Sequence, residues 1–223
     1  MLYLVPGPIG NLEDITLRAI NVLKKVALIL AEDTRTSAVL LKHYHIETKT
    51  IAFHSFNEHA KTKSIIEQLK AGTSMALLSD AGTPGISDPG FLLTRACWEA
   101  GIKVVALPGP TALIPALVAS GIPSDKFFFE GFLPHKKGRL TRLEFLANLP
   151  HTFILYESPH RLVKTLQQLV ECCGEARPAA VARELTKVHE EVLNDSLIGL
   201  YQHFSNAGKI RGELVLVVSG NKF

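Results

Sequence analysis

The sequence predicts an α/β protein, with a doubly wound, mostly parallel sheet in its N-terminal half and a mixed sheet in its C-terminal half. Two observations lead to this fold class. Short apolar runs alternate with segments of helical periodicity, and a polar or glycine-rich loop follows most of the runs. The runs are also continuous rather than alternating, which is typical of strands that are covered on both faces.

Five strand–loop–helix units make up the N-terminal half, and the repetition of this unit favours parallel strands. The first unit shows the pattern: an apolar run precedes a helical period in which Ile15, Ala19 and Leu23 share one face. The expected strands are Leu2–Val5, Ala27–Ala31, Thr50–Phe53, Met75–Ser79 and Val104–Leu107. The expected helices are Ile15–Lys25, Ser37–Tyr44, Lys61–Ala71, Pro89–Ala100 and Ala112–Ser120.

The pattern changes at Gly121–Pro123, which we interpret as a domain boundary between residues 1–121 and 122–223. Beyond this point strands sometimes follow one another without a helix, and a mixed sheet is therefore expected. The expected strands are Phe127–Gly131, Phe153–Tyr156, Ala179–Arg183, Glu190–Leu193 and Glu213–Ser219. The expected helices are Lys137–Asn148, Arg161–Cys173 and Ser196–Ser205.

Composition excludes several classes of protein. The chain has 223 residues, of which 47% are hydrophobic and 20% charged, so it can bury a core and intrinsic disorder is not expected. A net charge of +3 does not by itself identify a nucleic-acid-binding protein. The three cysteines form no C-x-x-C pair, which argues against a disulfide scaffold and a zinc site.

One uncharged stretch, Val104–Ser124, approaches the length of a membrane span. It contains Pro108, Pro110 and Pro115, which would break a spanning helix. The N-terminus lacks the pattern of a secretory signal. We therefore expect a strand, a loop and a helix here, in a soluble cytoplasmic protein without a membrane partner.

Three glycine- and proline-rich loops follow expected strands, at the sheet edge where open α/β sheets bind ligands. The densest is Asp80–Gly90, and the others are Val5–Asn11 and Leu107–Thr111. Asp88 and Pro89 suit the first positions of a helix, whose free N–H groups favour an anion. Each loop alone is compatible with an ordinary turn, but together they predict the walls of a site.

Charged residues follow the second and third strands at the same edge. Asp33 and Arg35 fit either a helix cap with an ion pair or a polar site that supplies a base. Glu58 lies between His54 and His59, but this spacing matches no standard metal site, and no metal is expected.

Two segments of the C-terminal half are strongly charged. Gly131–Leu143 has five basic or histidine side chains and no acidic one, which indicates either a solvated helix face or a contact with phosphates. Arg183–Glu191 follows an apolar strand and fits either an ion-pair network or a wall that faces substrate.

Seven motifs occur in an order that closely resembles the tetrapyrrole-methylase-like family and, within it, the ribosomal RNA small-subunit methyltransferases I. They are VPGPIGNLEDITLRA, AEDTR, SDAGTPGISDPG, LPGPTAL, FEGFLP, YESPHR and ARELTKVHEE, and the resemblance spans Val5 to Val218. One departure is visible, because Gly7 stands where the family usually has threonine.

The resemblance implies two α/β domains with S-adenosylmethionine (the methyl donor) in the cleft between them, a homodimer and no metal. By match to the family's loops, the cofactor-binding residues are Pro8, Asp80, Gly82, Thr83, Pro84, Gly85, Ser87, Pro108, Gly109, Pro110, Thr111 and Ala112, with Tyr156, Arg183 and Leu185 from the C-terminal half.

The resemblance also implies methyl transfer to the ribose 2′-hydroxyl of a cytidine in 16S ribosomal RNA, near the decoding site, in free RNA or in the assembled small subunit. Lys136, Lys137, Arg139, Arg142 and Arg161 would then meet RNA phosphates, which position the substrate.

The reaction needs a proton acceptor and an aligned substrate. Asp33, Glu58 and Glu157 are candidate acceptors, and Arg35 is a candidate for orienting the ribose or phosphate. Our hypothesis places the base in the loop of Asp33 or that of Glu58.

Two alternatives remain open. A methyltransferase of the same fold that acts on a tetrapyrrole or a small metabolite would not need the basic stretch. A non-catalytic RNA-binding or ribosome-assembly module would not need the cofactor loops.

Overall fold

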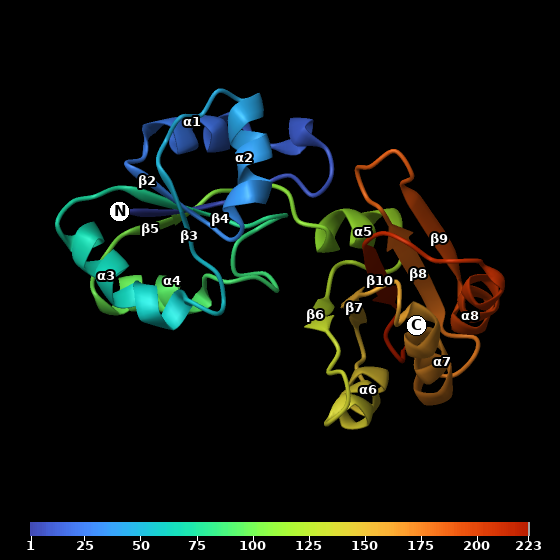
Figure 1. Cartoon of the computed structure of the whole chain (residues 1–223). Coiled ribbons are helices and arrows are strands. Elements are labelled where there is room, and N and C mark those ends of the chain that lie inside the picture. The colour runs from blue at the N-terminus through green and yellow to red at the C-terminus, as the bar shows by residue number, and fades with distance from the viewer. Residues whose placement is uncertain (223) are drawn as a thin grey trace. The chain divides into compact units, whose positions relative to one another are not determined.

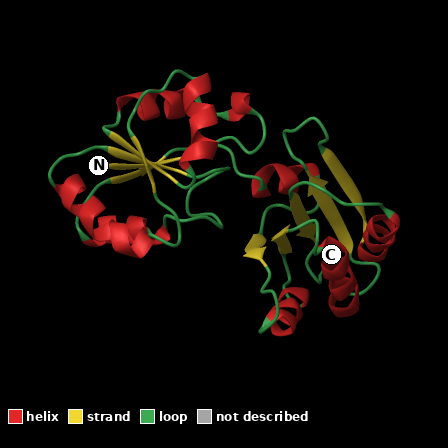
Figure 2. Ribbon diagram, viewed as in Figure 1, coloured by secondary structure: helices red, strands yellow, loops and turns green. Residues whose placement is uncertain are grey.

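The structure is a computed structural model that describes residues 1–222, and the chain divides into two compact units, 1–111 and 112–223 (Figures 1 and 2). The α/β fold class is confirmed, as is the change from a parallel to a mixed sheet. The division falls about ten residues before the predicted boundary. The reason is that α5 (Leu113–Ala119) packs against β7 (Thr152–Glu157) and β10 (Leu214–Val218), which belong to the second unit.

Unit 1 contains a parallel sheet with the strand order β3-β2-β4-β1-β5. Each strand matches an apolar run of the sequence. The elements are β1 (Leu2–Val5), η1 (Leu12–Asp14), α1 (Leu17–Lys25), β2 (Leu28–Ala31), α2 (Thr34–His43), β3 (Thr50–Ala52), α3 (Glu58–Lys70), β4 (Met75–Leu78), α4 (Phe91–Glu99) and β5 (Val104–Ala106).

Helices cover both faces of this sheet, with α1 and α2 on one face and α3 and α4 on the other (Figure 1). Successive strand residues point to opposite faces, so Ile29 joins the core under α1 and α2 while Leu30 joins the core under α3 and α4. This double burial explains why the strands are continuous apolar runs. The loops that follow β1, β4 and β5 leave the sheet at one edge, since these strands are parallel neighbours.

Unit 2 contains a mixed sheet with the order β6-β7-β10-β8-β9, in which only β6 and β7 are parallel. The predicted elements are present, and the strand expected at Glu190–Leu193 extends to Ser196. The elements are α5, β6 (Phe127–Phe132), α6 (Arg139–Ala147), β7 (Thr152–Glu157), α7 (Leu162–Cys173), β8 (Pro178–Arg183), β9 (Glu191–Ser196), α8 (Leu197–Asn206) and β10 (Leu214–Val218).

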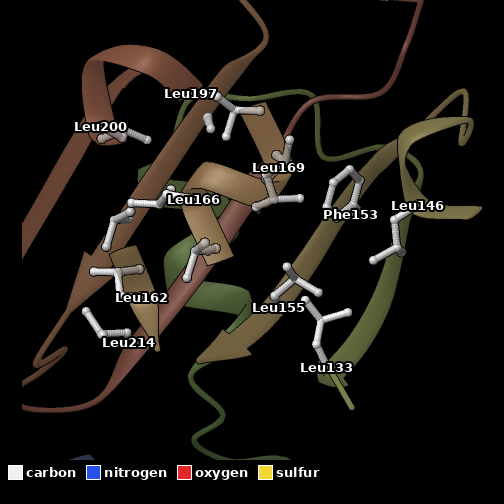
Figure 3. Close-up of a cluster of buried hydrophobic side chains, with 14 of the residues drawn as sticks. Leu133, Leu146, Phe153, Leu155, Leu162, Leu166, Leu169, Leu197, Leu200 and Leu214 are labelled. Carbon is white, nitrogen blue, oxygen red and sulfur yellow. The ribbon is translucent and has the colours of Figure 1, made fainter. Parts of the chain in front are cut away.

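The core of unit 2 lies between one face of this sheet and the helices α6, α7 and α8. Figure 3 shows Phe153 and Leu155 of β7 with Leu166 and Leu169 of α7 in this cluster. All four side chains are fully buried. Unit 2 therefore has a hydrophobic core of its own, on which its sheet packs.

Two sequence-based interpretations can be compared directly with the structure. The uncharged stretch is β5, a loop and α5, as expected, and none of the described helices is long and apolar enough to cross a membrane. The predicted start of α4 at Pro89 is wrong. The helix begins at Phe91 after Gly90, whose φ of +135° turns the chain, so Asp88 does not cap it.

Substitution of Gly109 by alanine should destabilise unit 1. A Cβ atom there would lie 2.7 Å from the Cβ of Pro6, so the loops after β1 and β5 would have to separate. We expect a loss of about 1–3 kcal/mol in the free energy of unfolding, measured by denaturant titration. Gly208→Ala is the control, since a Cβ there meets nothing within 4 Å. Equal stability of the two variants would contradict this interpretation.

Candidate functional site

Three loops meet at the carboxyl edge of the sheet in unit 1, where β4, β1 and β5 are neighbours. The amide of Gly7 donates to the carbonyl of Gly82 at 2.9 Å, and the amide of Gly82 donates back at 3.1 Å. The hydroxyl of Thr83 donates to the carbonyl of Pro110 at 2.9 Å. Convergence of the three loops is therefore observed. They carry Pro8, Asp80, Gly82, Thr83, Pro84, Gly85, Ser87, Pro108, Gly109, Pro110 and Thr111, while Ala112 begins unit 2.

Two glycines of the central loop have different surroundings. Gly82 and Gly85 have φ angles of +72° and +85°, which side chains with a Cβ rarely adopt. A Cβ at Gly82 would lie 3.4 Å from the Cγ2 of Ile9, whereas one at Gly85 would meet nothing within 4 Å. Gly82 therefore packs the loops together, and the backbone at Gly85 faces open space that a ligand can approach.

Gly7, the departure from the family pattern, keeps its backbone role. A Cβ there would lie 3.4 Å from the Cδ1 of Leu78 and from the carbonyl oxygen of Ser79, which is ordinary contact. The glycine is therefore not required for space, and both backbone bonds to Gly82 are present. The departure removes a hydroxyl group without disturbing the pairing of the loops.

Asp33 and Arg35 form a local pair after β2. The Asp33 carboxylate caps α2 by accepting from the amide of Arg35 at 2.8 Å, and it accepts from the Arg35 guanidinium at 2.7 Å. These hydrogen bonds lower the pKa of Asp33 to about 2. The amide of Asp33 also donates to Asp80 Oδ1 at 3.0 Å, which links this loop to the one after β4. The cap and the ion pair are confirmed, and a catalytic role for either residue stays a prediction.

Three more carboxyl groups lie at the same edge, and burial raises the pKa of each: Glu32, Asp80 and Asp88. The largest change is at Asp88, where burial and then the charge of Glu32 raise the pKa to about 7, although a hydrogen bond from Ser79 opposes this. The sequence pattern indicates Asp88 only as a helix cap. The position of Asp88 in the loop after β4 could have indicated a site residue, but the burial of its carboxyl group cannot be predicted from the sequence.

Glu58, a predicted catalytic residue, is buried at the start of α3 and contacts the start of α4. Its Oε1 accepts from the amides of Gly90 at 3.3 Å and Leu93 at 3.4 Å. These are free donors of the first turn of α4, so the carboxylate acts as a cap supplied by another helix. The structure thus gives Glu58 a structural role, and its catalytic role stays a prediction.

All three arginines predicted to meet RNA have partners inside unit 2. Arg139 is buried, and its guanidinium donates to Thr165 Oγ1 at 2.6 Å and to Gln168 Oε1 at 2.8 Å. Arg161 donates to the buried carboxylate of Glu157 at 2.7 Å. Glu157, a candidate base, is likewise occupied, because Thr165 Oγ1 donates to its Oε2 at 2.6 Å.

Arg142 is the third engaged arginine. It pairs with Glu130, and its guanidinium lies 5.3 Å from the ring centre of Phe128 and 4.4 Å from that of Phe145. Two cations of the acid-free run, Arg139 and Arg142, are therefore paired with carboxylates from neighbouring strands. Of the five predicted RNA contacts, Lys136 and Lys137 are the exposed ones.

The remaining predicted residues lie at strand ends of unit 2. Tyr156, in β7, packs edge-on against the rings of Phe129 and Phe132. Arg183, at the end of β8, donates to Glu191 at 3.0 Å, and Leu185 is buried just beyond it. Their predicted contact with a cofactor stays a prediction.

Within residues 1–222, no group of three or more His, Cys, Asp and Glu side chains is placed to hold a metal ion. His54 Nε2 lies 2.9 Å from the side-chain nitrogen Nδ2 of Asn57, so this histidine takes part in local loop structure.

Removal of the Glu58 side chain should reduce stability. Glu58→Ala leaves two amides at the start of α4 without their acceptor, and we expect a loss of about 1–2 kcal/mol in the free energy of unfolding. Lys63→Ala, on an exposed position of the same helix, should change it by less than about 0.5 kcal/mol. Denaturant titration of both variants checks this, and a Glu58→Ala variant as stable as the control would contradict the capping role.

Comparison with known proteins places this geometry in a family. The model of the tetrapyrrole (corrin/porphyrin) methylases matches residues 1–199. Ribosomal RNA small subunit methyltransferase I of Vibrio cholerae is 50% identical over 222 residues, covering 99% of this chain and 77% of that protein. Ribosomal RNA small subunit methyltransferase I of Escherichia coli O157:H7 is 49% identical over 225 residues, covering 99% of this chain and 78% of that protein.

Solved structures share the fold at low identity. Uroporphyrin-III-C-methyltransferase from Thermus thermophilus has a TM-score of 0.68 and 22% identity, covering 99% of this chain and 94% of that one. Diphthine synthase has a TM-score of 0.72 and 13% identity, with 98% and 89% covered. The family match and the sequence relatives confirm the resemblance carried by the seven motifs. The chain therefore belongs to the tetrapyrrole methylase family and, within it, to the ribosomal RNA small subunit methyltransferase I family.

Proposed function

We propose that this methyltransferase modifies the ribose 2′-hydroxyl of a cytidine in 16S ribosomal RNA, near the decoding site. The observation that carries the proposal is the set of relatives named ribosomal RNA small subunit methyltransferase I, one of them 50% identical over 99% of this chain. Those names specify a ribosomal RNA of the small subunit. The 2′-hydroxyl, the cytidine and the site come from the motif resemblance.

The methyl donor is S-adenosylmethionine, which supplies a methyl group activated by a positively charged sulfonium. The residues of unit 1 fit such a group. Glu32, Asp80 and Asp88 put negative charge at the edge where the three loops meet, and the backbone at Gly85 faces open space. We assign cofactor binding to the loops 80–87 and 108–111, whose backbone groups suit a polar ligand.

The protein's own task is to align the acceptor oxygen with the methyl group and to take up the hydroxyl proton. Asp88 is the best matched acceptor at this edge, because a base works best when its pKa lies near the working pH. Asp33 is poorly matched, because Arg35 holds its pKa at about 2. We therefore assign Asp33 and Arg35 to positioning and Asp88 to proton transfer.

Exposed cations are the groups of unit 2 that can reach RNA phosphates. Lys136 and Lys137 are exposed, whereas Arg139, Arg142 and Arg161 are held by internal partners. We assign RNA contact to the two lysines, and structural roles to the three arginines. A homodimer that acts in the cytoplasm is part of the same proposal.

One experiment tests the proposed function. Wild-type protein is incubated with labelled S-adenosylmethionine and either an unmodified 16S rRNA transcript or small subunits that lack the modification. We expect label on one ribose, located by primer extension at low nucleotide concentration. Label on a base, or on neither RNA substrate, would contradict the proposal.

The alternatives predict different results. A methyltransferase of small substrates would label a tetrapyrrole and not RNA. A non-catalytic module would show no rise in melting temperature with saturating S-adenosylmethionine, whereas binding to the folded state must raise it.

Asp88→Asn should lower the rate of methyl transfer by about 100-fold or more, because general base catalysis typically contributes at least that much. In the wild type, kcat/KM should rise with pH through about 7, since Asp88 accepts a proton only after losing its own. The variant should lack this rise.

The control is Glu67→Gln, which removes one exposed carboxylate from α3. It should keep the wild-type rate and pH profile, and calorimetry should show S-adenosylmethionine binding in both variants. Wild-type turnover by Asp88→Asn would exclude Asp88 as the base without affecting the assignment of substrate.

A further inference from the structure

A surface pocket of about 580 Å³ lies in unit 2, between the segment that follows β8 and the segment that follows α8. Its volume is in the range of small-ligand sites. None of the roles assigned above uses it, apart from the predicted cofactor contact of Arg183. Arg183, Glu184 and Glu191 line it from the first segment, and Phe204, Lys209 and Arg211 from the second.

Hydrogen bonds fix the two segments against each other. The amide of Glu184 donates to the carbonyl of Glu213 at 2.9 Å, and Glu184 Oε1 accepts from the amide of Glu213 at 3.0 Å. Gly212 lies so close to Glu184 that a Cβ would fall 2.4 Å from its Cδ. The pocket therefore has walls that are held in place before any ligand binds.

The two carboxylates of the pocket are already paired. Glu191 accepts from Arg183 at 3.0 Å, across a directly paired position of β8 and β9. Glu184 accepts from Lys187 at 2.9 Å, which helps to lower the pKa of its carboxyl group. Their negative charge is thus largely compensated within the protein.

The cations of the second segment are not compensated in this way. Lys209 and Arg211 are exposed and form no ion pair with any residue of the described part of the chain. His189 and His203 are also exposed in the lining. The pocket therefore carries an excess of positive charge at its rim, above an apolar floor that includes the buried ring of Phe204.

The position of the charges favours a chain of phosphates over a single enclosed anion. The C-terminus of α8, at Asn206, ends at the pocket, and its partial negative charge disfavours an anion at the floor. Lys209 and Arg211 are long side chains separated by one residue, so they can meet successive phosphates at the rim. A polynucleotide backbone presents charges in this manner.

We propose that this pocket is a contact site for the sugar–phosphate backbone of the RNA substrate, with Lys209 and Arg211 each meeting one phosphate. The inference rests on the proposed function, because it takes the substrate to be RNA. This RNA contact site is distinct from Lys136 and Lys137. Its cations lie outside the acid-free run Gly131–Leu143, so that run did not indicate the site.

The test is the binding of an unmodified 16S rRNA transcript to the full chain, measured without cofactor over a range of salt concentrations. The double variant Lys209→Gln/Arg211→Gln should reduce the slope of log affinity against log salt by about 1.4, since each contact with a single strand contributes about 0.7. Over a tenfold change of salt this corresponds to a change of about 25-fold in relative affinity.

Two controls make the result specific. Lys126→Gln/Lys164→Gln removes two exposed charges of the same unit outside the pocket and should leave the slope unchanged. Lys209→Arg/Arg211→Lys keeps both charges and should keep the slope. Melting curves show that each variant is folded.

A wild-type slope in the glutamine variant would overturn the inference, as would an equal loss in the Lys126/Lys164 control. Absence of RNA binding by the wild type would overturn it as well. Failure of the proposed function has a different signature, because RNA would then bind with the predicted salt dependence but no ribose would be methylated.

Discussion

Two backbone hydrogen bonds between Gly7 and Gly82 hold the site of unit 1 together. Both bonds join the loop after β1 to the loop after β4, and the bond from Thr83 to Pro110 adds the loop after β5. Gly82 makes this contact with a φ of +72°, which residues with a Cβ rarely adopt, although a Cβ there would meet Ile9 and Pro110 only at ordinary contact distances. The parallel strands bring the loops to one edge, and this pairing fixes how they lie there.

Charge is distributed differently in the two units. In unit 1, Glu32 and Asp88 are partly buried and lie near the exposed Asp80, and desolvation raises the pKa of all three carboxyl groups, to about 7 at Asp88. In unit 2, the three arginines that the resemblance assigns to RNA phosphates are paired with carboxylates of the same unit. Arg139 and Arg161 both lie beside Glu157, whose burial would be costly without them.

Much of the fold could be predicted from the sequence because local pattern determines it. Continuous apolar runs identify the strands of the parallel sheet, and the glycine-rich loops identify the edge at which they converge. The errors arise where distant residues decide the outcome. Gly90 rather than Asp88 is the residue before α4. A Cβ at position 90 would lie 2.8 Å from the Cδ2 of Leu77 in β4, which the sequence pattern does not reveal. Arg142 of the acid-free run pairs with Glu130, which lies in β6 just before the run. The pattern of charges along the sequence does not predict this pair.

We expect the Gly7–Gly82 contact to shape the cofactor site, and calorimetric titration of S-adenosylmethionine into two glycine variants tests this most directly. Gly82→Ala and Gly72→Ala both place a Cβ on a residue with positive φ, +72° and +94°, so their backbone strain is matched. Gly72 lies in the turn after α3, and a Cβ there meets nothing within 4 Å. We predict weakened cofactor binding in Gly82→Ala and wild-type binding in Gly72→Ala. Wild-type affinity in both folded variants would contradict the role of this contact.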